Sequence, residues 1–428
     1  MDVMEVTSKT MEFAEITETE FNTFAHGHRL GNFVQSVGMA KRRATAGWAP
    51  HYVGVYDEAG ALVAAALLHS RHILRGYYDF ECAQGPLLDY DNTELVTFFL
   101  TELKRWAKSK RALQVRVSPP VLAIHRDQDA QPVVDDYTGQ PVITLLERLG
   151  FGQVSNDEVD RNPAYVRWYF TKDLSGYTTL DDVLKTVDQQ TRWSINKARK
   201  FGVEVEVLTK RDELSRFFDI LAATGIRLGF DPRDLAYYES LFDSFGPEQA
   251  IFTIAKLNVA AYKNSLREQI EILMSESSSL DETDAKVARR VRANREQIEL
   301  YQGKIDDADA MAFGKEYIPL AAAVFMHHGP ELAYFMSGSD ENYRSFNGPY
   351  ALQAFALEYA LQHGVTRYNF YGTNGVFNNH PEQEGVYKFK YGFGGVIEEQ
   401  IGHFIYDASP LLNVARRLLV ALRRLIGR

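Results

Sequence analysis

The chain has 428 residues, of which 45% are hydrophobic and 24% charged, as expected of a water-soluble protein with two or three folded domains. Its single cysteine, Cys82, excludes a disulfide framework and any site built from several cysteines. The net charge of −10 argues against binding of nucleic acid by the whole surface, so such binding has to use local basic patches. The acidic N-terminus does not resemble a signal peptide and no run of about 18 apolar residues occurs, so we expect a cytoplasmic protein without a membrane span.

Two stretches of the chain share one order of predicted elements. In the first, a strand within 51–60 is joined by a turn to a second strand at 61–69. A helix at 92–110 and a strand at 112–120 follow. In the second, strands at 319–328 and 331–339 precede a helix at 351–364 and a strand at 366–372. The repeat predicts a duplicated α/β unit. Between the copies, the patterns predict strands at 162–174 and 203–208 and helices at 179–202 and 213–227.

Residues 257–309 have a heptad pattern of their own, interrupted by a polar turn at 275–284. The repeating positions are Val259, Tyr262, Leu266, Ile270 and Leu273 before the turn, and Val287, Val291, Asn294, Ile298, Tyr301 and Ile305 after it. This spacing predicts two helices that form an antiparallel coiled-coil arm. Because strands are predicted at 249–257 and 317–325, we expect the arm to be inserted between neighbouring strands of the second unit.

Two segments are strongly basic. The first, near the expected tip of the arm, contains Lys286, Arg289, Arg290, Arg292 and Arg295. It suits either a nucleic-acid backbone or a solvated helix face balanced by Glu296 and Glu299. The second, 411–428, repeats a pair of arginines after seven residues among leucines. It predicts a helix that either docks on the core or rests on an anionic membrane surface.

Common catalytic and metal-binding motifs are absent from the sequence, so we expect no metal. The α/β units are compatible with an acyl-CoA acetyltransferase fold. However, the glycine-rich pyrophosphate loop of such enzymes is missing after both 61–69 and 319–328. We therefore do not expect CoA as the donor.

The segment EGVYKFKYGFGG, residues 384–395, has two interpretations. It alternates like an edge strand, which would leave Lys388 and Lys390 solvated. It also follows RYNFYGTNG, residues 367–375, which predicts a strand that ends in a glycine-containing loop, where α/β sheets bind ligands. In that setting Lys390 places a positive charge beside Phe389, suited to a phosphate or a developing oxyanion.

YNFYGTNG followed by EGVYKFKYGF resembles the FemABX family of peptidoglycan bridge aminoacyltransferases. The stretches 33–41, 191–205 and 223–242 also resemble family segments, so the likeness covers nearly the whole chain. The helical hairpin resembles the arm of the Fem proteins proper. The resemblance implies two GNAT-like domains: residues 1–150, completed by about 396–428, and residues 151–256 with 310–395. The arm, 257–309, is inserted in the second domain.

The resemblance also implies an activity, the transfer of an amino acid from aminoacyl-tRNA to the stem-peptide amine of a peptidoglycan precursor. Aminoacyl-tRNA is then a co-substrate, no cofactor is needed, and the acceptor is lipid II or UDP-MurNAc-pentapeptide. The implied substrate-binding residues are Lys41, at the precursor's phosphates, Arg227, in the same groove, Tyr334, on a strand that contacts the precursor, and Phe389, near the tRNA end. Lys390 is implied in the transfer itself, and the basic residues of the arm in binding tRNA.

One departure from the family pattern concerns the general base. The family often has Arg-x-Asp-Pro at the end of the first unit's last strand, whereas this chain has Ser118 in place of the acid. A base at that position is therefore in doubt. Two other functions stay open on sequence alone: a CoA-dependent N-acyltransferase acting on another amine, and a non-catalytic cell-wall scaffold whose arm binds partners.

Overall fold

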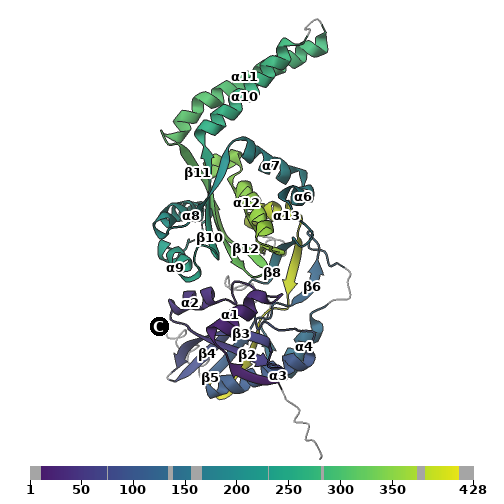
Figure 1. The fold of residues 1–428 in the computed structure, drawn as a ribbon, viewed down its shortest axis with the longest axis vertical. Coiled ribbons are helices and arrows are strands. Elements are labelled where there is room, and N and C mark those ends of the chain that lie inside the picture. Colours follow the sequence, from purple (N-terminus) through teal and green to yellow (C-terminus); the bar gives the residue numbers. More distant parts are fainter. Residues whose placement is uncertain are drawn as a thin grey trace, which may run out of the picture.

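The computed structural model describes residues 11–74, 76–133, 138–155, 166–229, 231–280, 284–373 and 381–413, without the side chains of 381–384. Two mixed sheets form two lobes stacked end to end, and a helical hairpin projects from the outer end of the second lobe (Figure 1). The predicted α/β class with an inserted coiled-coil arm is confirmed. Within the described residues, no helix is long and apolar enough to cross a membrane.

Seven strands form the sheet of the first lobe. In spatial order they are β1 (Glu12–Glu15), β2 (Ala49–Tyr56), β3 (Leu62–Leu74), β4 (Tyr77–Cys82), β5 (Ala112–Val117), β15 (Phe404–Asp407) and β7 (Gly152–Gln153). Strands β1 to β4 pair antiparallel, whereas β4 and β5 pair in parallel. A parallel pair needs a crossover, and α3 (Thr93–Ser109) provides it. The other helices here are α1 (Glu18–Gly27), α2 (Val37–Ala44) and α4 (Gln140–Arg148).

Eight strands form the second sheet. In spatial order they are β6 (Leu122–Arg126), β14 (Val396–Gln400), β8 (Trp168–Asp173), β13 (Arg367–Gly372), β12 (Glu331–Ser339), β11 (Tyr317–His328), β10 (Ala250–Asn258) and β9 (Val203–Leu208). Its helices are α6 (Leu180–Lys185), α7 (Gln189–Lys200), α8 (Leu214–Leu228), α9 (Leu235–Phe245) and α12 (Gly348–Gln362), with short 3₁₀ turns η1 (Arg211–Glu213) and η2 (Glu341–Phe346).

Both faces of the second sheet are covered by helices. Strand β11 shows why, because its apolar side chains alternate between two cores. Ala321, Ala323 and Phe325 pack in one core with α12, while Ala322 and Val324 pack in the other with α8 and α9. A strand buried on both sides is apolar throughout, as the sequence of β11 is.

The predicted duplication is confirmed by the strand pairing. In the first sheet, the antiparallel strands β2, β3 and β4 lead through α3 to the parallel strand β5. In the second, the antiparallel strands β10, β11 and β12 lead through α12 to the parallel strand β13. The two lobes thus repeat one arrangement of strands and crossover helix.

Some strands pair in the sheet of the other lobe, so the boundaries of the two lobes differ from the expected domain limits. Strand β15 pairs with β5 and β7 in the first sheet, so a C-terminal segment does return to the first lobe. However, 122–126 (β6) and 396–400 (β14) pair with each other in the second sheet, and 152–153 (β7) belongs to the first. Residue patterns predict a strand but not its sheet, because either sheet satisfies its backbone hydrogen bonds.

The arm consists of α10 (Val259–Ser278) and α11 (Ala285–Ala312), which pack against each other antiparallel. In the sequence the arm follows β10 and precedes β11, and these two strands are paired neighbours in the sheet. Its buried positions include Leu266, Ile270, Val291 and Ile305, as the heptads predict. Asn294 is also buried, and its Nδ2 donates to Ser277 Oγ across the two helices at 3.0 Å. A single polar pair of this kind fixes the register of a coiled coil.

The C-terminal part of the chain differs from one interpretation of the sequence. Residues 381–391 form a helix, α13 (Pro381–Tyr391), so the edge-strand interpretation of VYKFKYGF is wrong. Its aromatic residues also fit helical spacing, since Tyr387 and Tyr391 are four residues apart with ring centroids 5.9 Å apart. Most of the predicted basic C-terminal helix, residues 414–428, lies outside the described residues.

Candidate active site

Two adjoining cavities lie between the lobes. The larger, of about 290 Å³, is lined by the loop 29–34 of the first lobe and by residues of β12, β13 and β14 of the second. The smaller, of about 180 Å³, shares Phe33, Tyr169 and Tyr371 with it. Because ligands bind preferentially where two domains meet, these cavities mark the candidate active site.

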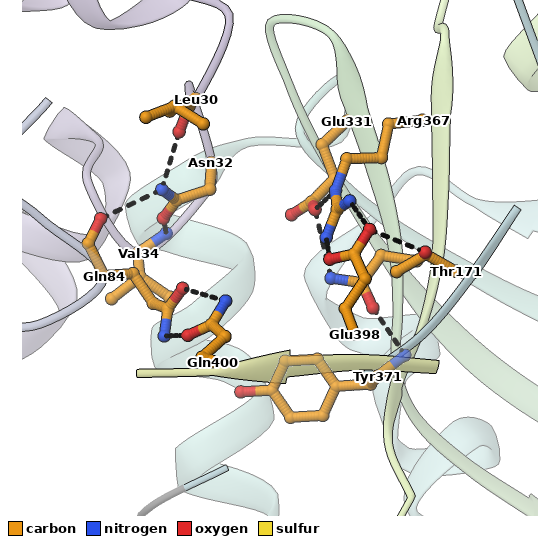
Figure 2. A network of polar contacts seen from close by, with 11 residues as sticks. Leu30, Asn32, Val34, Gln84, Thr171, Glu331, Arg367, Tyr371, Glu398 and Gln400 are labelled. Atoms are coloured by element: carbon orange, nitrogen blue, oxygen red, sulfur yellow. Dashed lines mark hydrogen bonds and ion pairs between the residues drawn. The ribbon is translucent and has the colours of Figure 1, made fainter. Parts of the chain in front are cut away.

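One wall of the larger cavity carries three charged side chains, of which Glu331 is buried and Arg367 and Glu398 are half-buried (Figure 2). Arg367 Nε donates to Glu331 Oε2 at 2.8 Å, and its Nη2 donates to Glu398 Oε2 at 2.7 Å. Thr171 Oγ1 donates to Glu398 Oε1 at 2.8 Å, and Asn369 Nδ2 donates to Glu331 Oε2 at 3.0 Å. One guanidinium therefore faces two carboxylates, which gives this wall an excess negative charge.

Contacts within the network favour the ionised forms of Glu398 and Arg367. Burial raises the pKa of Glu398, but the charge and hydrogen bonds of Arg367 outweigh burial and leave that pKa below its ordinary value. Burial opposes the charge of Arg367 as well, yet the two carboxylates raise its pKa above the ordinary value. The network thus depends on Arg367: its removal would leave both carboxylates without a cationic partner, whereas removal of one carboxylate would leave the other paired with Arg367.

The opposite wall presents a group of side-chain amides (Figure 2), and the first lobe also lines the cavity with Asp91 and with Arg29, whose Nη2 lies 3.7 Å from Asp89 Oδ1. Asn32 Nδ2 donates to the carbonyl oxygens of Leu30 and Gln84 at 3.0 and 3.1 Å, and its Oδ1 accepts from the backbone of Val34 at 3.1 Å. The side-chain amides of Gln84 and Gln400 bond to each other at 2.9 and 3.3 Å. These amides bind the first lobe to β14, so they close the cavity from one side.

Aromatic rings form the rest of the site. The rings of Tyr169 and Tyr371 meet edge to face at 5.7 Å, and Phe33 lies 6.2 Å from Tyr371. Tyr371 has a φ of +65°, a left-handed conformation that is unfavourable for a bulky residue. Its backbone nitrogen donates to Asn369 Oδ1 at 2.8 Å, which helps to hold this conformation. The bend at the end of β13 turns the ring of Tyr371 toward the cavity.

Lys390 lies beneath this bend rather than in the cavity wall. Its side chain is buried, and Nζ donates to the carbonyl oxygens of Gly372 and Tyr371 at 2.5 and 3.4 Å. Burial lowers the pKa of Lys390 to about 7. The amine can therefore gain or lose a proton near neutral pH, and it contacts the cavity wall through the backbone of Tyr371.

The glycines that follow Lys390 allow close packing. A Cβ atom on Gly395 would lie 2.3 Å from the carbonyl oxygen of Thr171. Lys172, which sequence reasoning missed, is buried and donates to the carbonyl oxygens of Phe393 and Gly394 at 3.0 and 2.8 Å. Burial lowers the pKa of Lys172 to about 8. The turn after α13 is thus held by a buried lysine from β8.

Two of the expected substrate-binding residues lie in the core of the second lobe. Phe389 is half-buried, with the rings of Tyr350 and Phe393 at 5.1 and 5.3 Å. Tyr334 stacks on Phe325 at 5.6 Å. Neither lines the two cavities. Because side chains alternate along β12, Phe335 faces the smaller cavity instead of Tyr334.

The other two expected residues are exposed and belong to different lobes. Lys41 lies in the last turn of α2, and Arg227 lies in the last turn of α8, with Nη1 3.7 Å from Glu341 Oε2. Neither lines the larger or the smaller cavity. A ligand that contacts both residues would have to extend over the surface outside these cavities.

The five basic residues of the arm are exposed on the first half of α11, toward the tip. Arg290 forms an ion pair with Glu276 at 3.2 Å, and Arg292 forms one with Glu296 at 3.4 Å. Figure 1 places the tip at the end of the molecule opposite the first lobe. A partner that contacts both the arm tip and the cavities would have to span most of the second lobe.

Ser118, at the position of the family's acid, contacts a histidine in the smaller cavity. Its Oγ lies 2.5 Å from Nδ1 of His403, and both residues line that cavity. Burial, with a smaller contribution from Arg116, lowers the pKa of His403 to about 4, so the imidazole is neutral at pH 7. Among the residues described, no three His, Cys, Asp or Glu side chains are grouped so as to hold a metal ion.

Comparisons with known proteins agree with this architecture. The model of the FemAB family matches residues 16–420. The chain is 28% identical over 403 residues to aminoacyltransferase FemA of Staphylococcus aureus, strains bovine RF122 / ET3-1 and MW2, over 92% of this chain and 95% of each relative. A crystal structure of FemX superimposes with a TM-score of 0.76 at 24% identity, over 94% of this chain and 99% of that one. The chain therefore belongs to the FemAB family.

Sequence reasoning missed the charged wall. Glu331 and Arg367 begin neighbouring parallel strands and are register partners, so their opposite charges meet. A signal was present, because a charged residue opens each of two strands and is followed directly by buried residues, 332–333 in β12 and 368–370 in β13. Glu398, on β14, joins them only because β14 enters the second sheet beside β8.

Proposed function

We propose that the chain is an aminoacyltransferase that moves an amino acid from aminoacyl-tRNA to the stem-peptide amine of a peptidoglycan precursor. The observation that carries the proposal is the FemAB family match over residues 16–420, together with relatives named aminoacyltransferase over 92% of the chain. The interlobe cavities support it, because they provide an enclosed place for two reacting groups. We propose the cytoplasm as its location, with lipid II or UDP-MurNAc-pentapeptide as acceptor.

The chemistry requires positioning more than covalent catalysis. An aminoacyl ester is already activated, so no enzyme nucleophile is needed. Alignment of amine and ester in one enclosed site can supply about 7–11 kcal/mol. Negative charge then grows on the ester carbonyl oxygen and on the departing ribose oxygen. Donors that meet this charge lower the barrier further.

Lys390 is our candidate for the group at the transfer centre. Its pKa of about 7 lets it carry a proton in part of the population at neutral pH. As an ammonium it would stabilise the end of β13 through Gly372 and offset charge developing beside Tyr371. We propose Phe389, on the same helix, as a packing platform near the tRNA end. Both residues lie behind the cavity wall, so direct contact with substrate requires movement of α13.

Surface residues complete the proposal. Lys41 and Arg227 are proposed to bind the precursor's phosphates from the two lobes, and Tyr334 to support the strand beside them. The basic residues of the arm, Lys286, Arg289, Arg290, Arg292 and Arg295, are proposed to bind the tRNA backbone. The basic C-terminal helix is proposed to contact the inner membrane surface, which would favour a lipid-linked acceptor.

The test is incubation of the purified protein with a mixture of charged tRNAs and with each precursor form, followed by mass spectrometry. A precursor heavier by one amino-acid residue, dependent on charged tRNA, is expected. Omission of tRNA and addition of acetyl-CoA provide the control for a CoA-dependent acyltransferase. A mass increase of one acetyl group without tRNA would overturn the proposal in favour of that alternative, and no product with any donor would favour a scaffold.

A further inference from the structure

The larger cavity contains one acceptor atom that the protein leaves unused. Glu331 is 5% exposed, and both of its hydrogen bonds, from Arg367 Nε and Asn369 Nδ2, go to Oε2. Oε1 has no hydrogen-bond partner among the described residues. Figure 2 shows this second oxygen turned toward the gap that separates the two walls. Because Glu331 is largely removed from solvent, this oxygen favours a ligand or water that can donate a hydrogen bond to it through the cavity.

The charge balance of the wall says what would satisfy it. Arg367 is shared between Glu331 and Glu398, so one negative charge is left without a cationic partner in this network. Both oxygens of Glu398 already accept hydrogen bonds, from Arg367 and Thr171. The vacant acceptor and the excess charge therefore coincide at Glu331. This position favours a ligand that is both a cation and a hydrogen-bond donor.

The neighbouring aromatic rings favour the same ligand. Tyr169 and Tyr371 line the cavity with Glu331, and the hydroxyl groups of both tyrosines lack partners among the described residues. Aromatic faces attract cations, and phenol oxygens accept hydrogen bonds from them. Across the gap, the amides of Asn32, Gln84 and Gln400 are paired with each other or with backbone, so they do not compete.

We propose that Glu331 Oε1, with Tyr169 and Tyr371, forms a subsite for a primary ammonium group of a substrate. This inference rests on the proposed function, in which both substrates carry such a group. The chemistry favours the α-ammonium of the aminoacyl ester. That group can stay protonated throughout transfer, whereas the acceptor amine has to lose its proton before it attacks. The subsite would thereby orient the aminoacyl end and reject N-blocked donors.

The test is equilibrium binding with two matched pairs of probes. The donor pair is a short RNA ending in an amide-linked glycine with a free or an acetylated amine. The acceptor pair is lysine-containing UDP-MurNAc-pentapeptide with a free or an acetylated side-chain amine. We expect the wild type to bind the free-amine donor about tenfold more tightly than the acetylated donor. Glu331→Gln should reduce this ratio to near one.

Glu399→Gln is the matched control. Glu399 is a buried neighbour on β14, paired with Arg126 and Arg167 at 2.7 and 2.5 Å, and it does not line either cavity. It should keep the wild-type ratio. If Glu331→Gln does not fold, Tyr169→Phe, which removes only the phenol oxygen, should lower the ratio about threefold.

The outcomes separate the two proposals. Discrimination confined to the acceptor pair would assign the subsite to the acceptor amine. Equal binding of free and acetylated probes in both pairs, or an equal loss in Glu399→Gln, would overturn it. If the wild type transfers an amino acid but does not discriminate between free and acetylated probes, the proposed function is supported and the proposed subsite is overturned. If the wild type discriminates between the probes but transfers no amino acid, the proposed subsite is supported and the proposed function is overturned.

Discussion

The side-chain amine of Lys390 lies 2.5 Å from the carbonyl oxygen of Gly372, at the point where β13 ends. This contact connects α13 to the strand that carries Tyr371 into the cavity. A change at Lys390 can therefore reach the candidate active site in two ways, by loss of a charge and by release of the bend. The first two predictions measure what loss of this side chain does to transfer and to stability.

Replacement of Lys390 by Met should lower the transfer rate at saturating substrates by about a hundredfold, the usual effect of losing one donor that stabilises developing charge. The dissociation constant of the acceptor should change little. Lys388→Met, an exposed lysine on the same helix, is the matched control. Steady-state rates and acceptor binding measure the two effects. A weakened acceptor complex with an unchanged rate would refute a role at the transfer centre.

The depressed pKa of Lys390 also predicts a pH-dependent stability. The ordinary lysine pKa is 10.5 and the folded one is about 7, so between these pH values the unfolded chain binds more protons. The free energy of unfolding should therefore rise with pH in this window, by up to about 1.4 kcal/mol per pH unit from this group. Denaturant unfolding of the wild type and of Lys390→Met at pH 7 and 9 measures the difference, in which the contribution of Lys172 cancels. Parallel pH dependence in both proteins would contradict a buried lysine with this pKa.

If the protonated form of Lys390 takes part in transfer, the rate should decline as pH rises through about 7. The residual activity of Lys390→Met should lack this decline. Rates over pH 6 to 9, with a buffer series of constant ionic strength, provide the measurement. A decline that persists in the variant would assign it to another group that has to stay protonated, such as the α-ammonium of the aminoacyl ester.

Charge reversal on the arm should weaken tRNA binding in a salt-dependent way. Arg289→Glu with Arg292→Glu is expected to raise the apparent constant for aminoacyl-tRNA and to reduce the slope of log affinity against log salt by about 2. Arg267→Glu, an exposed reversal on α10, is the control for net charge. An unchanged slope would mean that these arginines form a solvated face, as the pairing of Arg292 with Glu296 allows.

The turn after α13 should tolerate no side chain at Gly395. A Cβ atom there would lie 2.3 Å from the carbonyl oxygen of Thr171, so Gly395→Ala should lower the free energy of unfolding by about 1–3 kcal/mol. Gly385→Ala, on α13 with no atom within 4 Å of its Cβ position, should leave stability unchanged or raise it by about 0.5–1 kcal/mol. Thermal or denaturant unfolding compares the two. Equal effects would show that close packing is not the reason for glycine in this turn.

Sequence periodicity determined the elements of this protein and their repetition. The heptads predicted an arm whose buried positions include Leu266 and Val291, and the repeated order of strands and helix predicted two related sheets. Both signals are local, because each residue's burial follows from its place in a helix or strand. The segments YNFYGTNG and EGVYKFKYGF indicated the family for a related reason, since each is a continuous stretch of sequence and the two are close together in the chain.

The tertiary structure decided what periodicity does not encode. Glu331, Arg367 and Glu398 meet only because β12, β13 and β14 enter one sheet, and the cavity beside them requires the first lobe. Burial, which lowers the pKa of Lys390, depends on how α13 packs against the end of β13. The sequence specifies which residues are ionisable. Their solvation and their partners depend on segments that are distant in the chain, so only the folded structure determines them.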